Sequence, residues 1–206
     1  MPLLMQPLMQ PLMPAISDRS IEAIVIGTSA GGIDALLAVL GGLPASFGPP
    51  ILVVLHLAED RKSRLTEVFR SRVALPVREA IDKIAIERGT VHFACAGYHL
   101  LVERDRTLSL SCEPPVHYSR PSIDILMESA ADVYGAGLLG ILLTGANQDG
   151  ACGLARVKEM GGFTVVQDPR EALVATMPQA AIAYSRPDLI LSLNEIHTLL
   201  LTLEKH

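Results

Sequence analysis

Short, wholly apolar runs alternate along this chain with segments whose apolar residues recur at helical spacing. The first pair is residues 23–26, Ala-Ile-Val-Ile, followed by Ile33, Leu36, Leu37 and Leu40. A run that is apolar at every position is typical of a strand buried on both faces, and spacings of three and four are typical of one helical face. Repeated alternation of this kind requires a mostly parallel sheet with helices on both faces. The sequence therefore predicts a three-layer, doubly wound α/β domain.

The same alternation continues to the end of the chain, with one interruption. Further strands are predicted at 51–55, near 77, and at 138–143, 163–166 and 189–191, and further helices over 64–72, over 123–134, from 150, after 177–178 and over 196–203. In the middle, three short apolar runs are separated by tight turns rather than by helices: 91–94, 99–102 and 108–111. That pattern predicts an antiparallel hairpin insert.

Composition excludes several classes of function. A chain of 206 residues that is 50% hydrophobic can bury a sizeable core in one domain. The net charge of −5 argues against a broad nucleic-acid surface. No apolar run approaches the roughly 20 residues that cross a bilayer, so we expect no membrane insertion and a cytoplasmic protein. Cys95, Cys112 and Cys152 lack CxxC or metal-ligand spacing and are expected to be reduced thiols.

The first 20 residues differ from the rest. Met5-Gln6-Pro7-Leu8 is repeated as Met9-Gln10-Pro11-Leu12. Proline at every fourth position prevents a regular helix, and the segment has neither the basic nor the uninterrupted apolar region of a signal peptide. We therefore expect residues 1–20 to be a disordered tail and residues 21–206 to form the folded domain. A hydrophobic docking peptide is the alternative interpretation of the tail.

Three reactive side chains follow predicted strand ends. Ser29 lies in the turn Gly27-Thr28-Ser29-Ala30-Gly31-Gly32, His56 follows the second strand, and Asp149 lies shortly after the 138–143 strand. In a parallel sheet these strand ends share one edge, where the ligand sites of such folds form. The sequence thus predicts that Ser29, His56 and Asp149 lie near one another.

These residue types together are suited to nucleophilic catalysis. A serine hydroxyl becomes a good nucleophile when an imidazole takes its proton, and a carboxylate on the other ring nitrogen orients that imidazole. Backbone amides at the helix start after Ser29, at Ala30, and in the turn around Ala146 are candidates to stabilise an oxyanion, with about 3 kcal/mol for each donor. The sequence predicts a serine hydrolase of esters or amides.

Each residue also has a simpler interpretation. The glycine-rich turn around Ser29 is compatible with phosphate or nucleotide binding at a helix start, although it is neither GxGxxG nor a P-loop. Asp149 before Gly150 is compatible with a plain N-cap of the following helix, and His56 with a surface histidine. A non-catalytic interaction domain with the same fold is a further alternative.

At the level of ordered motifs the chain resembles the catalytic domain of the CheB methylesterase family. The matching segments, in order, are 26–32, Leu55-His56, 120–126, 141–145, 149–151 and Met177-Pro178, and the resemblance covers about residues 20–203. It implies a doubly wound α/β sheet with a hairpin and a cofactor-free serine hydrolase. The implied reaction removes methyl groups from glutamyl methyl esters on the cytoplasmic helices of chemoreceptors, and in many members also deamidates glutamines.

The resemblance also implies individual roles. Ser29 corresponds to the nucleophile, His56 to the general base and Asp149 to the orienting carboxylate, while Arg120 and Met177 correspond to residues that line the cleft.

The chain departs from the family at three points. Typical members carry an N-terminal receiver domain that controls the esterase, whereas only about 20 residues precede the first strand here. We therefore expect that such control does not act in cis, and a separate receiver-domain protein is a candidate partner. Asn147 stands where members commonly have glycine, and a turn that needs positive φ would suit glycine better. Ala30 stands where many members have threonine.

Other polar residues give weaker indications. His92, His99 and His117 have no spacing that defines a metal site, and none is expected. Arg61, Lys62 and Arg64 form a small basic cluster after His56. A solvated loop explains them, and our hypothesis is that they help to dock an acidic receptor helix.

Overall fold

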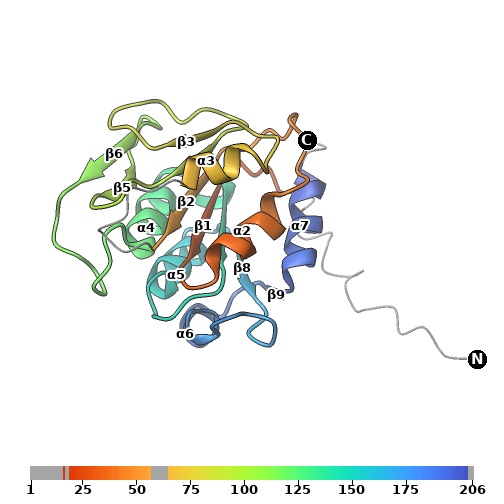
Figure 1. Cartoon of the computed structure of the whole chain (residues 1–206). Helices are drawn as coiled ribbons and strands as arrows, with labels where there is room; N and C mark the ends of the chain where they lie inside the picture. Colours follow the sequence, from red (N-terminus) through yellow and green to blue (C-terminus); the bar gives the residue numbers. More distant parts are fainter. Residues whose placement is uncertain (1–15, 17–18, 57–64, 204–206) are drawn as a thin grey trace, which may run out of the picture.

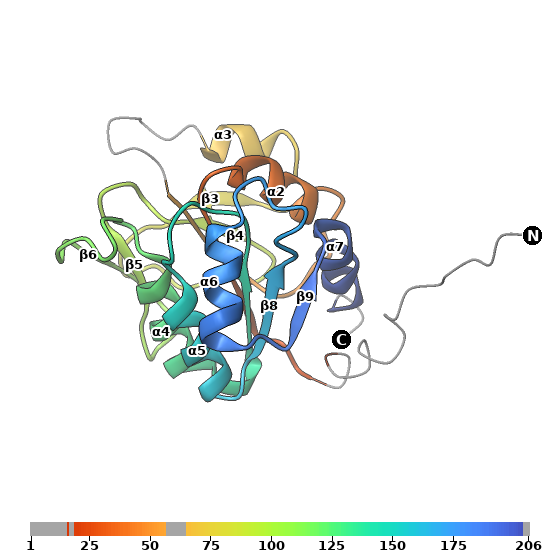
Figure 2. The same ribbon diagram turned by 90° about the horizontal axis from the view of Figure 1, so that it is seen from below.

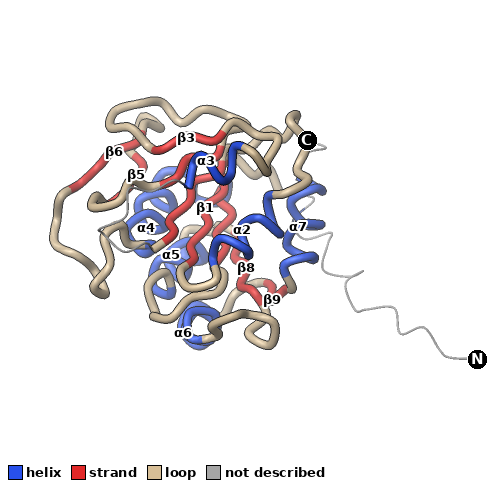
Figure 3. The backbone as a smooth tube through the Cα atoms, viewed as in Figure 1, coloured by secondary structure: helices blue, strands red, loops and turns tan. Residues whose placement is uncertain are grey.

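The computed structural model describes residue 16 and residues 19–56 and 65–203. Its centre is a seven-stranded parallel sheet, which can be followed in Figures 1 and 3. The strand order is β3-β4-β2-β1-β7-β8-β9, and every pair is parallel. The strands are β1 (Ala23–Thr28), β2 (Ile51–Leu55), β3 (Val77–Glu79), β4 (Val91–Phe93), β7 (Leu138–Leu142), β8 (Phe163–Gln167) and β9 (Leu189–Leu191). A separate antiparallel pair is formed by β5 (His99–Val102) and β6 (Leu108–Ser111).

Helices cover both faces of the sheet, which confirms the predicted fold class (Figure 2). One face packs against α2 (Gly32–Leu40), α3 (Leu65–Arg70) and α7 (Leu193–Thr202). The other packs against α4 (Ile123–Tyr134), α5 (Ala151–Glu159), α6 (Thr176–Ser185) and the β5–β6 pair. A short 3-10 helix, η1 (Gly135–Gly137), joins α4 to β7. Within the part of the chain that is described, no helix has the length and apolar character needed to cross a membrane.

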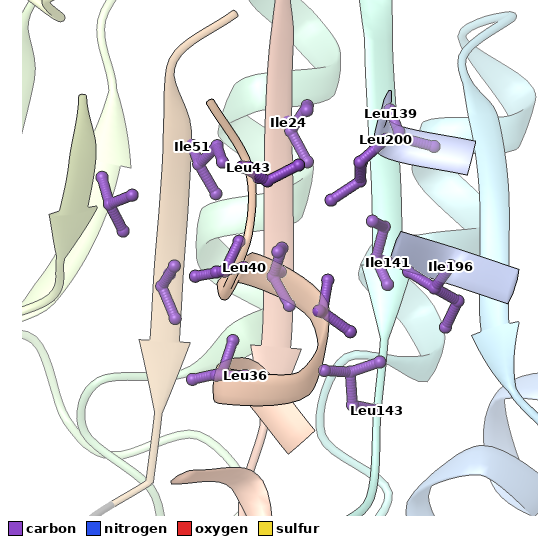
Figure 4. Packing of buried hydrophobic residues seen from close by; sticks show 14 of the residues in the cluster. Ile24, Leu36, Leu40, Leu43, Ile51, Leu139, Ile141, Leu143, Ile196 and Leu200 are labelled. Atoms are coloured by element: carbon purple, nitrogen blue, oxygen red, sulfur yellow. The ribbon is translucent and has the colours of Figure 1, made fainter. Parts of the chain in front are cut away.

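The central strand β1 shows why the sheet needs both layers. All six of its residues are buried, and alternate side chains enter different cores. Ile24 packs in the core formed with α2 and α7, to which Leu36 and Ile196 also belong (Figure 4). Val25 faces the opposite core, beneath α4 and α5. Full burial of one such side chain contributes about 1.5–3 kcal/mol, so neither face could be left open to water.

The first of the three central runs lies elsewhere than predicted. β4 pairs in parallel with β2 and β3 in the main sheet, and only β5 and β6 form the antiparallel pair. The reason is burial on both sides: all three residues of β4 are buried, with Val91 and Phe93 in the core beneath α2 and α3. A strand of a two-stranded insert would leave one face to solvent.

Residues from the expected tail also contact the domain. Ile16 is fully buried in the core on the α7 side, and Arg19 donates a hydrogen bond from Nη1 to the Gly161 carbonyl. The packed chain therefore starts before the expected boundary at residue 20. The remainder of the predicted tail, residues 1–15 and 17–18, lies outside the described residues.

The strand order reverses between β1 and β7. Strands β2, β3 and β4 lie on one side of β1, and β7, β8 and β9 on the other. Loops leaving the carboxyl ends of β1 and β7 therefore diverge to opposite sides, and this divergence is where doubly wound folds place their sites.

Candidate active site

Ser29 and His56 directly follow two neighbouring strands and lie side by side in register at the edge of the sheet. Thr28 and Leu55, the last residues of β1 and β2, are register partners, and Ser29 and His56 directly follow them. The His56 amide donates to the Thr28 carbonyl at 3.1 Å, and the Ser29 amide donates to the Thr144 carbonyl at 3.0 Å. The serine is thus held between the ends of β2 and β7, as the sequence predicts for a shared sheet edge.

His56 and Asp149 are in direct contact. His56 Nε2 lies 2.8 Å from Asp149 Oδ2, and the Asp149 side chain is fully buried. An ionised carboxylate only accepts, so Nε2 carries the proton and Nδ1 is the acceptor nitrogen of the neutral ring. The arrangement is the reverse of that in chymotrypsin-like proteases, where the aspartate faces Nδ1. In this protein, a proton from a nucleophile would go to Nδ1.

Asp149 is an N-cap, but of a helix distant in sequence. Its carboxylate accepts hydrogen bonds from the amides of Ile123 (2.7 Å) and Asp124 (3.1 Å) and from the Ser122 hydroxyl (2.8 Å). The helix is α4, and its own N-cap residue Ser122 makes no capping bond. Burial raises the pKa of Asp149, but the hydrogen bonds from His56 and the two amides outweigh it, and the pKa lies below its usual range. The carboxylate is therefore ionised at neutral pH.

Two glycines allow α4 to approach the strand ends this closely. A Cβ at Gly27 would lie 2.3 Å from Ile123 Cγ2, and one at Gly150 would lie 2.7 Å from the same atom. Gly150 also has φ of +96°, which favours glycine. Gly27 and Gly150 thus leave room for the Ile123 side chain, and this brings the start of α4 to Asp149.

Thr144, just after β7, fixes the loops that follow β1 and β7 relative to each other. Its carbonyl accepts from the Thr28 hydroxyl at 2.8 Å, and its hydroxyl donates to the Ala30 carbonyl at 2.8 Å. Its amide donates to Oε1 of the buried Gln167, also at 2.8 Å. Thr144 lies in the 141–145 motif, where no role is predicted for it, and no role is predicted for Gln167, a polar residue at the end of β8.

The Ser29 hydroxyl and two nearby backbone amides make no hydrogen bonds within the described residues. Within the described residues, the Ser29 side chain makes no hydrogen bond, including to His56, and the amides of Ala30 and Ala146 donate none. Free amides at these positions are what an oxyanion site needs. Hydrogen bonds of a nucleophile are often formed only when substrate is bound, so the open geometry is compatible with catalysis.

Arg120 and Met177 support the site from outside it. Arg120 donates from Nη1 to the carbonyls of Cys112 and Glu113, which ties down the segment after β6. Met177 is fully buried, and its Sδ and Cε would lie 2.6 Å from a Cβ at Gly145. The side chain thus packs beneath the Gly145-Ala146 turn and exposes no surface, which differs from the cleft-lining position expected for it.

Asn147 fits its turn without strain. It is not among the non-glycine residues with positive φ, so the expected conflict with glycine does not arise. Its side-chain oxygen accepts from the Asp149 amide at 3.2 Å.

The three central histidines lie in different surroundings. His99 binds the Pro114 carbonyl and the Ser122 amide, His117 faces Asp124, and His92 is buried in β4. Among the described residues, no three His, Cys, Asp or Glu side chains are grouped as metal ligands. The basic residues Arg61, Lys62 and Arg64 lie outside the described residues.

Asp124 is a second buried carboxylate, and it makes stability depend on pH. Burial raises its pKa to about 6; the Gly153 amide opposes the rise, and the charge of Asp149 adds to it. Its pKa in the unfolded chain is about 3.9, so from about pH 4 to pH 6 the native state retains a proton that the unfolded state has lost. The free energy of unfolding therefore falls as pH rises through this window, by up to about 3 kcal/mol.

Asp124→Asn should remove this dependence. The variant keeps the acceptor for the Gly153 amide, 2.7 Å away, but carries no charge. We expect it to be more stable than the parent chain by about 1–3 kcal/mol near pH 8 and nearly equal near pH 4.5, in urea unfolding. Asp132→Asn, on the exposed face of the same helix, is the matched control. A stability difference that is the same at both pH values would contradict the assignment.

Comparisons with known proteins agree on one family. The family model described as CheB methylesterase matches residues 24–200. A Leptospira interrogans protein, named provisionally as a protein-glutamate methylesterase/protein-glutamine glutaminase, is 45% identical, and the match covers 90% of this chain and 96% of that protein. A Bordetella avium protein named protein-glutamate methylesterase/protein-glutamine glutaminase 1 is 41% identical, and the match covers 88% of this chain but only 53% of that protein.

A solved structure gives the same result. The crystal structure of the Thermotoga maritima CheB methylesterase catalytic domain matches with a TM-score of 0.85 and 29% identity, covering 89% of this chain and 99% of that one. The matched fold places a doubly wound sheet where the sequence predicts one, and the family model extends from β1 into α7. The chain belongs to the CheB methylesterase family.

Proposed function

We propose that this protein is a protein-glutamate methylesterase that uses Ser29, His56 and Asp149 to hydrolyse glutamyl methyl esters on the cytoplasmic helices of chemoreceptors. The observation that carries the proposal is the buried 2.8 Å contact between His56 and Asp149, next to the half-buried turn that holds Ser29. Family membership supports the substrate class, because the Leptospira and Bordetella relatives are named for this activity.

The first half of the reaction forms an acyl-enzyme. Ser29 Oγ attacks the ester carbonyl carbon while its proton passes to His56 Nδ1. The carbonyl oxygen becomes an oxyanion that the free amides of Ala30 and Ala146 stabilise. The bond to the methoxy oxygen then breaks, the proton on Nδ1 passes to that oxygen, and methanol leaves.

The second half restores the enzyme. A water molecule gives a proton to Nδ1 as its oxygen attacks the acyl carbon, and collapse of the second tetrahedral intermediate releases the glutamate side chain and returns the proton to Ser29. The same steps on a glutamine side chain would release ammonia, which is the second activity in the relatives' names. Asp149 stays ionised throughout and stabilises the imidazolium.

A separate receiver-domain protein is the second proposed partner. The family resemblance implies control by a receiver domain, and the match covers about half of the Bordetella relative. The experiment for this partner is methanol release with and without a phosphorylated receiver protein, with a rise as the expected result.

Methanol release tests the proposed activity directly. The full chain should release methanol from receptor cytoplasmic fragments that a methyltransferase has labelled at glutamate, and none from unlabelled fragments. Chain treated beforehand with phenylmethylsulfonyl fluoride, which modifies activated serines, is the control and should release none. Absence of release from several methylated receptors would favour the non-catalytic interaction domain instead.

A further inference from the structure

Both ring nitrogens of His56 have partners in the resting protein. Nε2 contacts Asp149, while Nδ1 faces the Ser119 hydroxyl at 3.5 Å. Ser119 belongs to neither the predicted triad nor any motif that the sequence resemblance uses. Because Nδ1 is the atom that must take the proton, whatever holds it in the resting state bears directly on the reaction.

Ser119 completes a cycle of contacts that includes one backbone amide. Asn147 Nδ2 donates to Ser119 Oγ at 3.4 Å, and Asn147 Oδ1 accepts from the amide of Asp149, whose carboxylate contacts His56. The cycle thus runs from His56 through Asp149, Asn147 and Ser119 back to His56. The contact of Nε2 with Asp149 is short, at 2.8 Å, and the contact of Nδ1 with Ser119 is long, at 3.5 Å. The imidazole is therefore fixed through Nε2 while Nδ1 can still exchange partners.

A tight, strained turn holds Ser119 in place. Val116 and Ser119 exchange backbone hydrogen bonds of 3.1 and 2.8 Å, and the two residues between them, His117 and Tyr118, have φ of +48° and +62°. Positive φ costs a non-glycine residue roughly 1–2 kcal/mol, and such strain is concentrated at functional sites. The turn also sets the His117 carbonyl 3.4 Å from the Ser119 hydroxyl, which gives that hydroxyl a second acceptor.

We propose that Ser119 is a positioning residue for His56 and forms a hydrogen bond with Nδ1 in both protonation states of the imidazole. With the neutral ring, the Ser119 hydroxyl donates to Nδ1. When Nδ1 has taken the proton of Ser29, Ser119 Oγ accepts from Nδ1–H, and its own hydrogen turns to the His117 carbonyl. The second half of this inference rests on the proposed function, because it needs the proton transfer from Ser29.

Kinetics of Ser119→Ala and Ser119→Thr test the role. Loss of one hydrogen bond to a group that becomes charged should lower kcat for methanol release about fivefold to tenfold, with KM changed less than about twofold. Ser119→Thr keeps the hydroxyl and should restore kcat. Ser71→Ala, which removes an exposed hydroxyl that donates to the Val68 carbonyl, is the matched control and should behave as the parent chain.

A spectroscopic measurement keeps the proposal testable without activity. In full chain labelled with ¹⁵N-histidine, the Nδ1 signal of His56 should move in Ser119→Ala, return toward the parent position in Ser119→Thr, and stay unchanged in Ser71→Ala. If the parent chain releases no methanol, the proposed function fails while this signal still decides the role of Ser119.

Two results would overturn the inference. One is a Ser119→Ala variant with parental kcat and an unmoved Nδ1 signal. The other is a loss of activity as complete as that of Ser29→Ala together with sulfonyl labelling at Ser119, which would make Ser119 the nucleophile and not a positioning residue.

Discussion

Ser29→Ala should lower kcat for methanol release by about 10⁴- to 10⁶-fold, because no other group then attacks the ester within the site. Stability should change little, by less than about 0.5 kcal/mol, since the Ser29 hydroxyl makes no hydrogen bond in the described part of the chain. Methanol release and urea unfolding, measured on the same preparation, separate the two quantities. The free amides of Ala30 and Ala146 remain, so some rate above the uncatalysed reaction should persist.

Covalent labelling gives an independent readout for Ser29. A sulfonyl fluoride should attach to the peptide that contains Ser29 in the parent chain and to no peptide in the alanine variant. Ser71→Ala, on the exposed surface, should keep full activity and full labelling. Retention of activity in Ser29→Ala would remove the serine from the mechanism and leave the phosphate-binding interpretation of its turn.

Asp149→Ala should damage both catalysis and folding. The variant leaves the Ser122 hydroxyl and the amides of Ile123 and Asp124 without their acceptor in a fully buried place. Buried groups left without partners cost about 1–3 kcal/mol each, so the three together should lower the free energy of unfolding by at least about 3 kcal/mol. Loss of the partner of His56 should also lower kcat by about 10⁴-fold.

Asp149→Asn separates these two roles. The amide oxygen can still accept from α4, so stability should fall less than in Asp149→Ala. Its NH₂ group cannot accept from Nε2, so the ring takes the tautomer with hydrogen on Nδ1, and kcat should still fall by about 10⁴-fold. Ser192→Ala is the matched control, because it removes the cap of α7, distant in sequence from the triad, and should lower stability by about 1 kcal/mol with unchanged kcat. An Asp149→Asn variant with near-parental kcat would contradict the orienting role.

The sequence predicted the layers of the fold because its central strands are apolar throughout. β1 and β2 are buried on both faces, and only a covered parallel sheet allows that. The common location of Ser29, His56 and Asp149 was predictable because residues at the carboxyl ends of parallel strands share an edge. The prediction for β4 is wrong because a run of three buried residues is too short for its hydrophobic pattern to distinguish a strand of the main sheet from a hairpin strand.

The supporting contacts could not be read from the sequence. Asp149 precedes a helix, and local rules make it the cap of that helix, yet it caps α4, more than twenty residues earlier. Ser119 reaches His56 only because of a tight turn with two left-handed residues that carry no glycine signal. Such contacts depend on how separate loops are packed, and side-chain spacing along one segment does not encode that.

The capping of α4 by Asp149 has a consequence for the speed of proton transfer. Protein dipoles, from two amides and a hydroxyl, take the place that water would have around this carboxylate. These dipoles are fixed by the fold and would not reorient if positive charge appeared on the neighbouring imidazole, as the proposed mechanism requires. For the proposed proton transfer, the reorganisation energy around this carboxylate would therefore be small, because fixed dipoles at the start of α4 replace reorienting water.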